Sequence, residues 1–189
     1  MNLANAITLL RFILVPLIAA AIWCRADGLA LMLVLLSAAS DFADGQIARR
    51  LHQQTRFGAV ADPLADKLTQ VTVTLLLTWQ GSLPMWFTAA VVARDVLIVG
   101  GALAYHRLAG HVEMAPTRLS KLNTGLQFAV LAAVMAQRAD VITTAPAGDG
   151  WLDALLVLAL ATTVASGVQY VHEWSDRARR LPGPTTEAR

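Results

Sequence analysis

The stretch SDFADGQIARRLHQQTRFGAVADPLADKL, residues 40–68, places four aspartates in an otherwise apolar chain. They are Asp41, Asp44, Asp62 and Asp66. The first two are three residues apart, and the last two are four residues apart. Residues at these spacings lie on one face of an α-helix. The stretch therefore predicts two helices, each with an acidic face.

The composition around this stretch is that of a membrane protein. Of the 189 residues, 56% are hydrophobic and only 15% are charged, and the mean hydropathy is +0.54. A spanning helix needs about 20 apolar residues, so the chain has room for about six spans and for no second domain. The single cysteine, Cys24, excludes both an internal disulfide and a thiolate metal cluster.

Six apolar segments separated by turn signals predict an all-α integral membrane fold of six transmembrane helices. The segments are residues 5–24, 28–50, 56–79, 84–107, 117–138 and 151–174. We expect residues 1–175 to form one six-helix domain and residues 176–189 a polar tail. The first segment is interpreted as a retained helix, because no basic residues precede it and Arg11 interrupts its apolar run.

The distribution of basic residues predicts the orientation. With the N-terminus in the cytoplasm, twelve of the 15 Lys and Arg residues lie on or near the cytoplasmic side. These twelve are Arg11, Arg49, Arg50, Arg56, Lys67, Arg107, Arg118, Lys121, Arg177, Arg179, Arg180 and Arg189. Such an excess is the positive-inside signal of multi-pass proteins. It places the acidic faces, and hence the active site, at the cytoplasmic side. The absence of an Arg- and Ser-rich leader favours a bacterial cytoplasmic (inner) membrane.

Carboxylates at membrane depth require water or a compensating charge nearby, since each costs about 2.5 to 3.5 kcal/mol in a spanning helix. Small residues accompany them: Gly45 and Ala48 continue the face of the first aspartate pair, and Gly58 begins the face of the second. The two helices are joined by a short turn, so we expect them to be antiparallel neighbours with their acidic faces opposed. This arrangement predicts a polar cavity lined by carboxylates.

The chemistry of this cluster indicates hard divalent cations. Four carboxylates without histidine or cysteine suit Mg²⁺ or Mn²⁺ better than zinc, and paired cations of this kind assist displacement at phosphorus. A flat nucleotide has room beside Gly45, Ala48 and Gly58, and Arg49 is suited to phosphate oxygens. The alternative is that the aspartates form interfacial salt bridges with nearby basic residues. Four aspartates on two glycine-lined faces disfavour it.

The complete spacing carries a resemblance to a known family. The pattern Asp41-x2-Asp44-Gly45-x2-Ala48-Arg49-x8-Gly58-x3-Asp62-x3-Asp66 resembles the signature of the CDP-alcohol phosphatidyltransferases at all eight of its positions. The resemblance implies CDP-diacylglycerol as donor, CMP as product and two divalent metals held by the four aspartates. It further implies that Asp66 is the general base. The CDP-diacylglycerol site implied in this way consists of Asp41, Gly45, Ala48, Arg49 and Gly58. A homodimer is expected by resemblance alone.

Two later stretches bear on the acceptor alcohol. RDVLIVGGALAYHR, residues 94–107, and APTRLSKLNTGLQ, residues 115–127, resemble the cardiolipin synthase branch of the family, which implies phosphatidylglycerol as acceptor. The glycerol-3-phosphate branch is typified by Arg-Glu and Gly-Lys-x-Lys-Thr at the corresponding places. Because either acceptor carries a phosphate, Arg94, Arg118 and Lys121 are candidates to bind it. Arg118 and Lys121 have the alternative role of positive-inside anchors, and Arg94 that of an intramembrane partner of an acidic residue such as Asp95.

These residues predict a membrane phosphatidyltransferase that makes cardiolipin and CMP from CDP-diacylglycerol and phosphatidylglycerol. The alternative within the family is a phosphatidylglycerophosphate synthase using glycerol-3-phosphate. Another enzyme class, the intramembrane prenyltransferases, also uses paired aspartate motifs, but with other spacings. A cation transporter or channel lined by the four aspartates is the non-enzyme alternative, and it is disfavoured because all four lie toward one membrane face. No nucleic-acid partner is expected.

Overall fold

The fold is all-α, as the sequence predicts. The computed structural model describes the backbone of residues 3–51, 56–109, 117–142 and 150–179, and the side chains of 10–40, 61, 63–103, 117–142 and 150–176. Six helices occupy these ranges, close to the six predicted segments. They are α1 (Leu3–Trp23), α2 (Asp27–Leu51), α3 (Arg56–Trp79), α4 (Met85–Ala109), α5 (Arg118–Arg138) and α6 (Gly150–Arg179).

Local chemistry explains several helix ends. Arg25, Gly81 and Asp140 follow α1, α3 and α5 and have φ values of 56°, 76° and 54°. This left-handed conformation reverses the chain after a helix. Thr117 is the N-cap of α5, where its side chain accepts a hydrogen bond from the Ser120 backbone N–H. The chain therefore turns directly after these three helices, and the start of α5 is capped.

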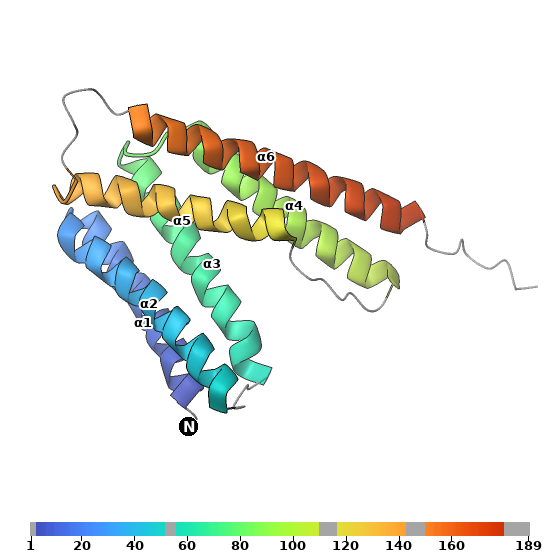
Figure 1. Ribbon diagram of the computed structural model, residues 1–189, viewed down its shortest axis with the longest axis horizontal. Coiled ribbons are helices and arrows are strands. Elements are labelled where there is room, and N and C mark those ends of the chain that lie inside the picture. Colours follow the sequence, from blue (N-terminus) through green and yellow to red (C-terminus); the bar gives the residue numbers. More distant parts are fainter. Residues whose placement is uncertain (1–2, 52–55, 110–116, 143–149, 180–189) are drawn as a thin grey trace, which may run out of the picture.

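The helices form two groups of three (Figure 1). In the first group α1 packs against both α2 and α3, and in the second α6 packs against both α4 and α5. The groups join where α5 contacts α2 and α3, and where α3 contacts α4. The described parts of α2 and α3 meet mainly through these shared neighbours and across a cavity. The short turn predicts direct packing of the two helices beside it, where the side chains lie outside the described residues, so that packing stays a prediction.

Buried side chains divide the molecule into two halves. The apolar half lies toward the ends of α1, α3 and α5 and is formed by Leu14, Ile18, Ile22, Val73, Leu77, Phe87, Val91, Val130, Val134 and Met135. The polar half lies toward the start of α3 and α5 and buries Arg11, Thr69, Gln70, Arg94, Asp95, Ser120, Asn123, Gln127, Thr163 and Ser166. Apolar packing therefore holds one half together, and buried polar side chains distinguish the other.

Three helices are long and apolar enough to cross a membrane within the described residues. These stretches are Met85–Leu103, Arg118–Arg138 and Gly150–Asp176. Two shorter apolar stretches, Leu10–Trp23 and Asp27–Ser40, belong to α1 and α2. Many large apolar side chains remain exposed on the outside of the helices. Lipid is the environment that such a surface requires.

Candidate active site

The eight-position motif lies on two helices of the first group, as its periodicity predicts. Asp41, Asp44, Gly45, Ala48 and Arg49 fall within α2, and Gly58, Asp62 and Asp66 fall within α3. The helical backbone confirms that each aspartate pair shares a helix face. Apart from Asp66, the side chains of the motif lie outside the described residues. Their roles as metal ligands and nucleotide contacts stay predictions.

Asp66 is the motif aspartate whose surroundings the structure describes. Its side chain is 40% exposed, and its Oδ1 atom lies 3.1 Å from Nη1 of Arg11 on α1. Arg11 itself is fully buried. A guanidinium enclosed by the bundle thus contacts a carboxylate that remains partly accessible. The contact restricts the position of Asp66 while leaving part of its carboxylate accessible.

Two cavities meet at Asp66. The α2 cavity has a volume of about 390 Å³ and lies between α2, α3 and α5, where Ser37, Thr69 and Ala132 contribute to its wall. The α4 cavity has a volume of about 350 Å³ and lies between α3, α4 and α5. Asp66 and Phe128 line both cavities. Their volumes are in the range of small-molecule sites, so two ligands can approach Asp66 from two sides.

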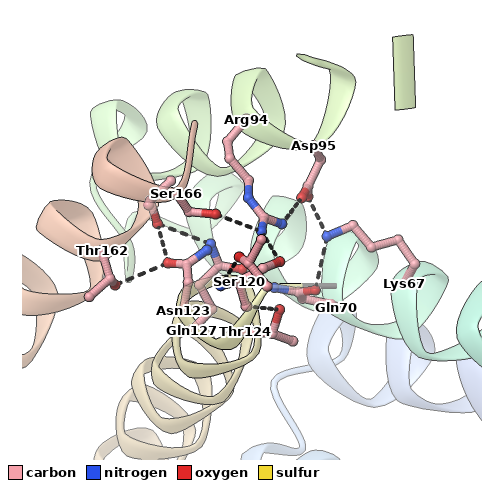
Figure 2. A network of polar contacts seen from close by, with 12 residues as sticks. Lys67, Gln70, Arg94, Asp95, Ser120, Asn123, Thr124, Gln127, Thr162 and Ser166 are labelled. Atoms are coloured by element: carbon pink, nitrogen blue, oxygen red, sulfur yellow. Dashed lines mark hydrogen bonds and ion pairs between the residues drawn. The ribbon is translucent and has the colours of Figure 1, made fainter. Parts of the chain in front are cut away.

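Arg94 organises the wall of the α4 cavity (Figure 2). Its Nη1 donates to Asp95 Oδ1 at 3.1 Å, and its Nη2 donates to Ser120 and, at 3.0 Å, to Ser166. The guanidinium also lies 5.9 Å from the ring centroid of Tyr170, a cation–π distance. Arg94 is therefore held by α4, α5 and α6. The predicted alternative, a pairing with Asp95, is present, while its role toward an acceptor phosphate stays a prediction.

Lys67 links Asp66 to this wall. Its Nζ forms an ion pair with Asp95 and donates to Gln70 Oε1 at 3.1 Å. Asp95 thus bridges two cations, one from α3 and one from its own helix. From the sequence, Lys67 was expected as a positive-inside residue or as an interfacial partner of a motif aspartate, and not as a partner of Asp95. The signal that it missed is position, since Lys67 directly follows the last motif aspartate and lies one turn before a buried glutamine.

Neutral side chains extend the network away from the charged residues (Figure 2). Gln70 donates to Gln127, which donates to Thr163 at 3.1 Å. The hydroxyl of Thr163 donates to Asn123 Oδ1 at 2.7 Å, and Thr162 donates to the same oxygen at 3.1 Å. These bonds connect α3, α5 and α6. Each of these amides bonds to a side chain on a neighbouring helix. The bonds therefore favour one rotation of each helix about its axis, because another rotation would leave the amides without partners.

The two other candidate acceptor residues lie at the start of α5. Arg118 and Lys121 are both exposed. Lys121 lies one turn before Thr124, which lines the α4 cavity, and Phe128 follows on the same face. Arg118 lies about 120° around the helix from Thr124 by helical geometry. The structure therefore brings Arg94 to the cavity wall; Lys121 lies on the helix face that carries Thr124 and Phe128, outside the lining itself, and Arg118 lies on another face.

Asp66 has the properties of a ligand for a hard cation. Carboxylate oxygens are what Mg²⁺ and Mn²⁺ prefer, and the partly exposed Asp66 faces two cavities. Among the described side chains, no three His, Cys, Asp or Glu residues form a cluster suited to a metal. Asp41, Asp44 and Asp62 lie outside that set. A site for two divalent cations is compatible with Asp66 and stays a prediction.

Comparison with known sequences settles the family. Residues 1–166 match the sequence model of the CDP-alcohol phosphatidyltransferases. The chain belongs to the CDP-alcohol phosphatidyltransferase family. Within this family, its relatives include the "Probable cardiolipin synthase (CMP-forming)" of Drosophila melanogaster, which is 33% identical over 187 residues. That alignment covers 90% of this chain and 57% of the Drosophila protein.

Two bacterial members of the family carry different names. The "Cardiolipin synthase (CMP-forming)" of Streptomyces coelicolor is 39% identical over 84 residues, covering 43% of this chain and 39% of that protein. The "CDP-diacylglycerol--glycerol-3-phosphate 3-phosphatidyltransferase" of Bacillus subtilis is 30% identical over 186 residues, covering 89% and 93%. The chain thus spans about half the length of the cardiolipin synthases that it matches, but nearly all of the Bacillus protein.

One contact of this CDP-alcohol phosphatidyltransferase family member was missed by sequence reasoning. Arg11 was predicted only to mark the cytoplasmic side, yet it holds Asp66. Its signal was available, because a charged residue that interrupts an apolar run needs a partner inside the bundle. The identity of that partner was not available, since 55 residues separate the two in sequence.

Proposed function

We propose that this chain is an integral membrane phosphatidyltransferase. It transfers the phosphatidyl group of CDP-diacylglycerol to the hydroxyl of phosphatidylglycerol and releases cardiolipin and CMP. The observation that carries the proposal is the place of Asp66, the last aspartate of the family motif, where two cavities meet. A transferase needs one reactive group between two substrates. The names of the Drosophila and Streptomyces relatives support the same reaction.

The proposed setting is the lipid bilayer of a bacterial cytoplasmic (inner) membrane, crossed six times. Residues 1–175 form the six-helix domain and residues 176–189 its tail, with the N-terminus in the cytoplasm. The helix ends of the apolar half carry the exposed tryptophans Trp23, Trp79, Trp86 and Trp151. Since tryptophans gather at both interfaces, these four mark one membrane interface, and the basic residues are the support for a cytoplasmic polar half.

Donor binding is assigned to the motif faces of α2 and α3. The nucleotide of CDP-diacylglycerol lies against Asp41, Gly45, Ala48, Arg49 and Gly58. Mg²⁺ or Mn²⁺, held as a pair by the four motif aspartates, supplies neutralisation of the diphosphate and of the charge on departing CMP. The accessible carboxylate of Asp66 supports this ligand set.

In the proposed reaction Asp66 takes the proton from the acceptor hydroxyl. The hydroxyl oxygen then forms a bond to the phosphorus that bears the diacylglycerol. The bond from this phosphorus to the bridging oxygen breaks, and its electron pair leaves with CMP. The contribution of Arg11 is positional: its guanidinium, 3.1 Å from Oδ1, limits where the Asp66 carboxylate can point.

The acceptor phosphate is assigned to the α4 cavity. Arg94 on its wall and Lys121, on the helix face that carries Thr124, are the proposed contacts, with Arg118 on another face. Glycerol-3-phosphate is the second candidate acceptor. The observation that favours it is the Bacillus relative, whose name specifies that substrate and which the chain covers over 93% of its length.

A homodimer is proposed by resemblance to the family. Small residues on exposed helix faces allow close contact between helices. A Cβ atom added to Gly100 or Gly125 would meet no atom within 4 Å, so both are open to a neighbouring helix. Gly101 is different, because an added Cβ would lie 2.7 Å from Trp174. Its small size therefore serves the packing of α4 on α6 within one chain.

One assay tests the reaction and the acceptor together. Purified protein in detergent with Mn²⁺ is given CDP-diacylglycerol and either phosphatidylglycerol or glycerol-3-phosphate, and CMP release is followed. We expect CMP with phosphatidylglycerol. Release with glycerol-3-phosphate alone would replace the acceptor by the second candidate. No CMP with either acceptor, from protein shown to be folded, would rule out both.

A further inference from the structure

The two cavities at Asp66 both reach the outside of the helices. The wall of the α2 cavity includes Leu35, whose side chain is 53% exposed, and the exposed Ala129. The wall of the α4 cavity includes Val99, 57% exposed, and the exposed Pro63. All four residues are apolar and belong to the outer surface of the helices, which faces lipid in the proposed bilayer setting. Each cavity is therefore open sideways toward the bilayer.

The α2 cavity lies next to the part of α2 that carries the donor motif. Ser37 and Ala38 line it, and they precede Asp41 by about one helical turn. A molecule whose nucleotide lies against the motif has its diacylglycerol part beside this cavity. We therefore assign the acyl chains of the donor to the α2 cavity. The α4 cavity is then available to the acceptor.

The α4 cavity has a charged floor and an apolar side. Lys67, Arg94, Asp95 and Asp66 line the floor, and the buried Arg11 pairs with Asp66, so three cations stand against two carboxylates. Nε of Arg94 is buried without a hydrogen-bond partner among the described residues. This surplus of one positive charge matches a phosphodiester, which carries one negative charge. A phosphomonoester carries about 1.5 to 2 negative charges at pH 7 and fits the floor less well.

The apolar side of this cavity leads onto a continuous surface of α4. Ile98, Val99 and Phe128 form its inner part. Val96, Val99 and Leu103 lie on one stripe of the helix and are 65%, 57% and 59% exposed. A free polyol phosphate has no group that such a stripe would accommodate. An acyl chain that leaves the cavity across Val99 would pack against this stripe.

We propose that the α4 cavity is a lateral port for a phospholipid acceptor. The phosphodiester lies against Lys67 and Arg94, the hydroxyl points to Asp66, and the acyl chains leave between α3 and α4 across Val99. This inference rests on the proposed function and adds to it a separate entry for each lipid. Lys67 is thereby added to Arg94 and Lys121 as a residue that binds the acceptor.

Bulky substitutions at the two ports separate the substrates. Val99→Trp narrows the α4 port, Ala129→Trp narrows the α2 port, and Val164→Trp adds the same side chain on an exposed apolar position of α6 as control. Initial rates of CMP release are measured against CDP-diacylglycerol and against phosphatidylglycerol. We expect Val99→Trp to raise the KM for phosphatidylglycerol by about tenfold with a much smaller change for the donor, and Ala129→Trp to do the reverse.

A deacylated acceptor completes the test. Glycerophosphoglycerol has the headgroup of phosphatidylglycerol without its chains, and we expect the unmodified protein to use it poorly and Val99→Trp to leave that low rate unchanged. Equal use of both acceptors, equal effects of the two port variants on both KM values, or a Val99→Trp variant that behaves like Val164→Trp would each overturn the proposal.

The proposed function fails in a different way, with no CMP from the unmodified protein. The port then still has a readout, because phosphatidylglycerol that binds the α4 cavity raises the melting temperature of the protein in detergent. We expect this rise for the unmodified protein and for Val164→Trp, and its loss in Val99→Trp. A rise of the same size in all three would overturn the port independently of catalysis.

Discussion

The apolar half and the polar half both bury side chains completely, but the buried side chains interact in different ways in the two halves. Ile18 and Phe87 are as inaccessible in the apolar half as Arg11 and Gln127 are in the polar half. The apolar residues pack without directional bonds, which holds the helices at fixed distances. The polar residues form a network of directional hydrogen bonds and ion pairs, and the two cavities lie beside this network. One half therefore supplies rigidity, and the other can keep open space beside Asp66 without losing its shape.

Removal of divalent cations should have the largest effect, and it should act on the polar half alone. Dialysis against a chelator is expected to abolish CMP release, and Mg²⁺ or Mn²⁺ to restore it, because the diphosphate would otherwise repel the motif carboxylates. Asp41→Asn should raise the cation concentration needed for half-maximal rate, whereas Asp153→Asn, an exposed carboxylate at the start of α6, should not. Full activity after verified metal removal would exclude the two-cation site.

Asp66→Asn should come next. General-base catalysis contributes about 10² to 10⁴ in rate, so we expect CMP release to fall by that order while CDP-diacylglycerol still raises the melting temperature. The neutral amide keeps the size of the side chain and one hydrogen-bond acceptor for Arg11. If Asp66→Asn turned over as fast as the unmodified protein, the proton acceptor would have to be another group.

Arg11→Gln should have an intermediate effect, because Arg11 on α1 holds the Asp66 carboxylate on α3. Arg11 is fully buried and holds Asp66, and a misplacement of about 1 Å at a reacting group costs about 10²-fold in rate. We expect kcat to fall by about 10- to 100-fold with little change in the KM for CDP-diacylglycerol. Arg11→Lys keeps the charge without the planar fork and should recover part of the rate.

The Arg11 variants are compared on the monodisperse fraction from size-exclusion chromatography, so that unfolded protein does not enter kcat. A purely structural role predicts a lower yield of folded protein with unchanged kcat per folded molecule. That result, for both Arg11→Gln and Arg11→Lys, would remove Arg11 from the positioning of Asp66.

Local features of the fold were predictable because they depend on neighbouring residues. The six apolar segments correspond to the six helices, and the hydroxyl of Thr117 caps α5 from three residues away. The spacing of the motif aspartates placed each pair on one helix, since helix periodicity acts over a single turn. The arrangement of the helices was less accessible. A short turn between α2 and α3 predicted direct packing near the turn, where the side chains lie outside the described residues. The contacts of these helices with α1, α4 and α5 had no local signal in the sequence.

The site was predictable to the same extent. Asp66 was identified by spacing, and Arg94 was singled out because a charge at membrane depth is costly. Its bonds to Ser120 and Ser166 join residues 26 and 72 positions away, which no local pattern encodes. The hydrogen bonds of Asn123 and Gln127 were not predicted either, because a polar residue on an apolar helix is equally compatible with a position at the lipid interface. Only the packing of α3, α5 and α6 shows that they bond to one another.

The smallest effects should come from exchanging side chains between the two halves along α5. Gln127 lies in the polar half and Met135 in the apolar half, and both are almost fully buried. Met135→Gln buries an amide among apolar neighbours, at a cost of about 1 to 3 kcal/mol. Gln127→Met removes the bonds to Gln70 and Thr163, and interhelical bonds of this kind contribute about 0.6 kcal/mol each on average in a membrane. We therefore expect about 1 kcal/mol from two such bonds.

Unfolding of both variants in detergent is followed by helical circular dichroism under one denaturant series. Met135→Leu is the matched control, because it keeps an apolar side chain of similar volume and should cost less than about 1.5 kcal/mol. The comparison depends on the sign of the change in the free energy of unfolding caused by Gln127→Met. We expect an apolar side chain to lower this free energy at position 127, although an apolar side chain is favoured at position 135. If Gln127→Met were as stable as the unmodified protein, the amide network would not hold α3, α5 and α6 together, and rigidity would come from the apolar half alone.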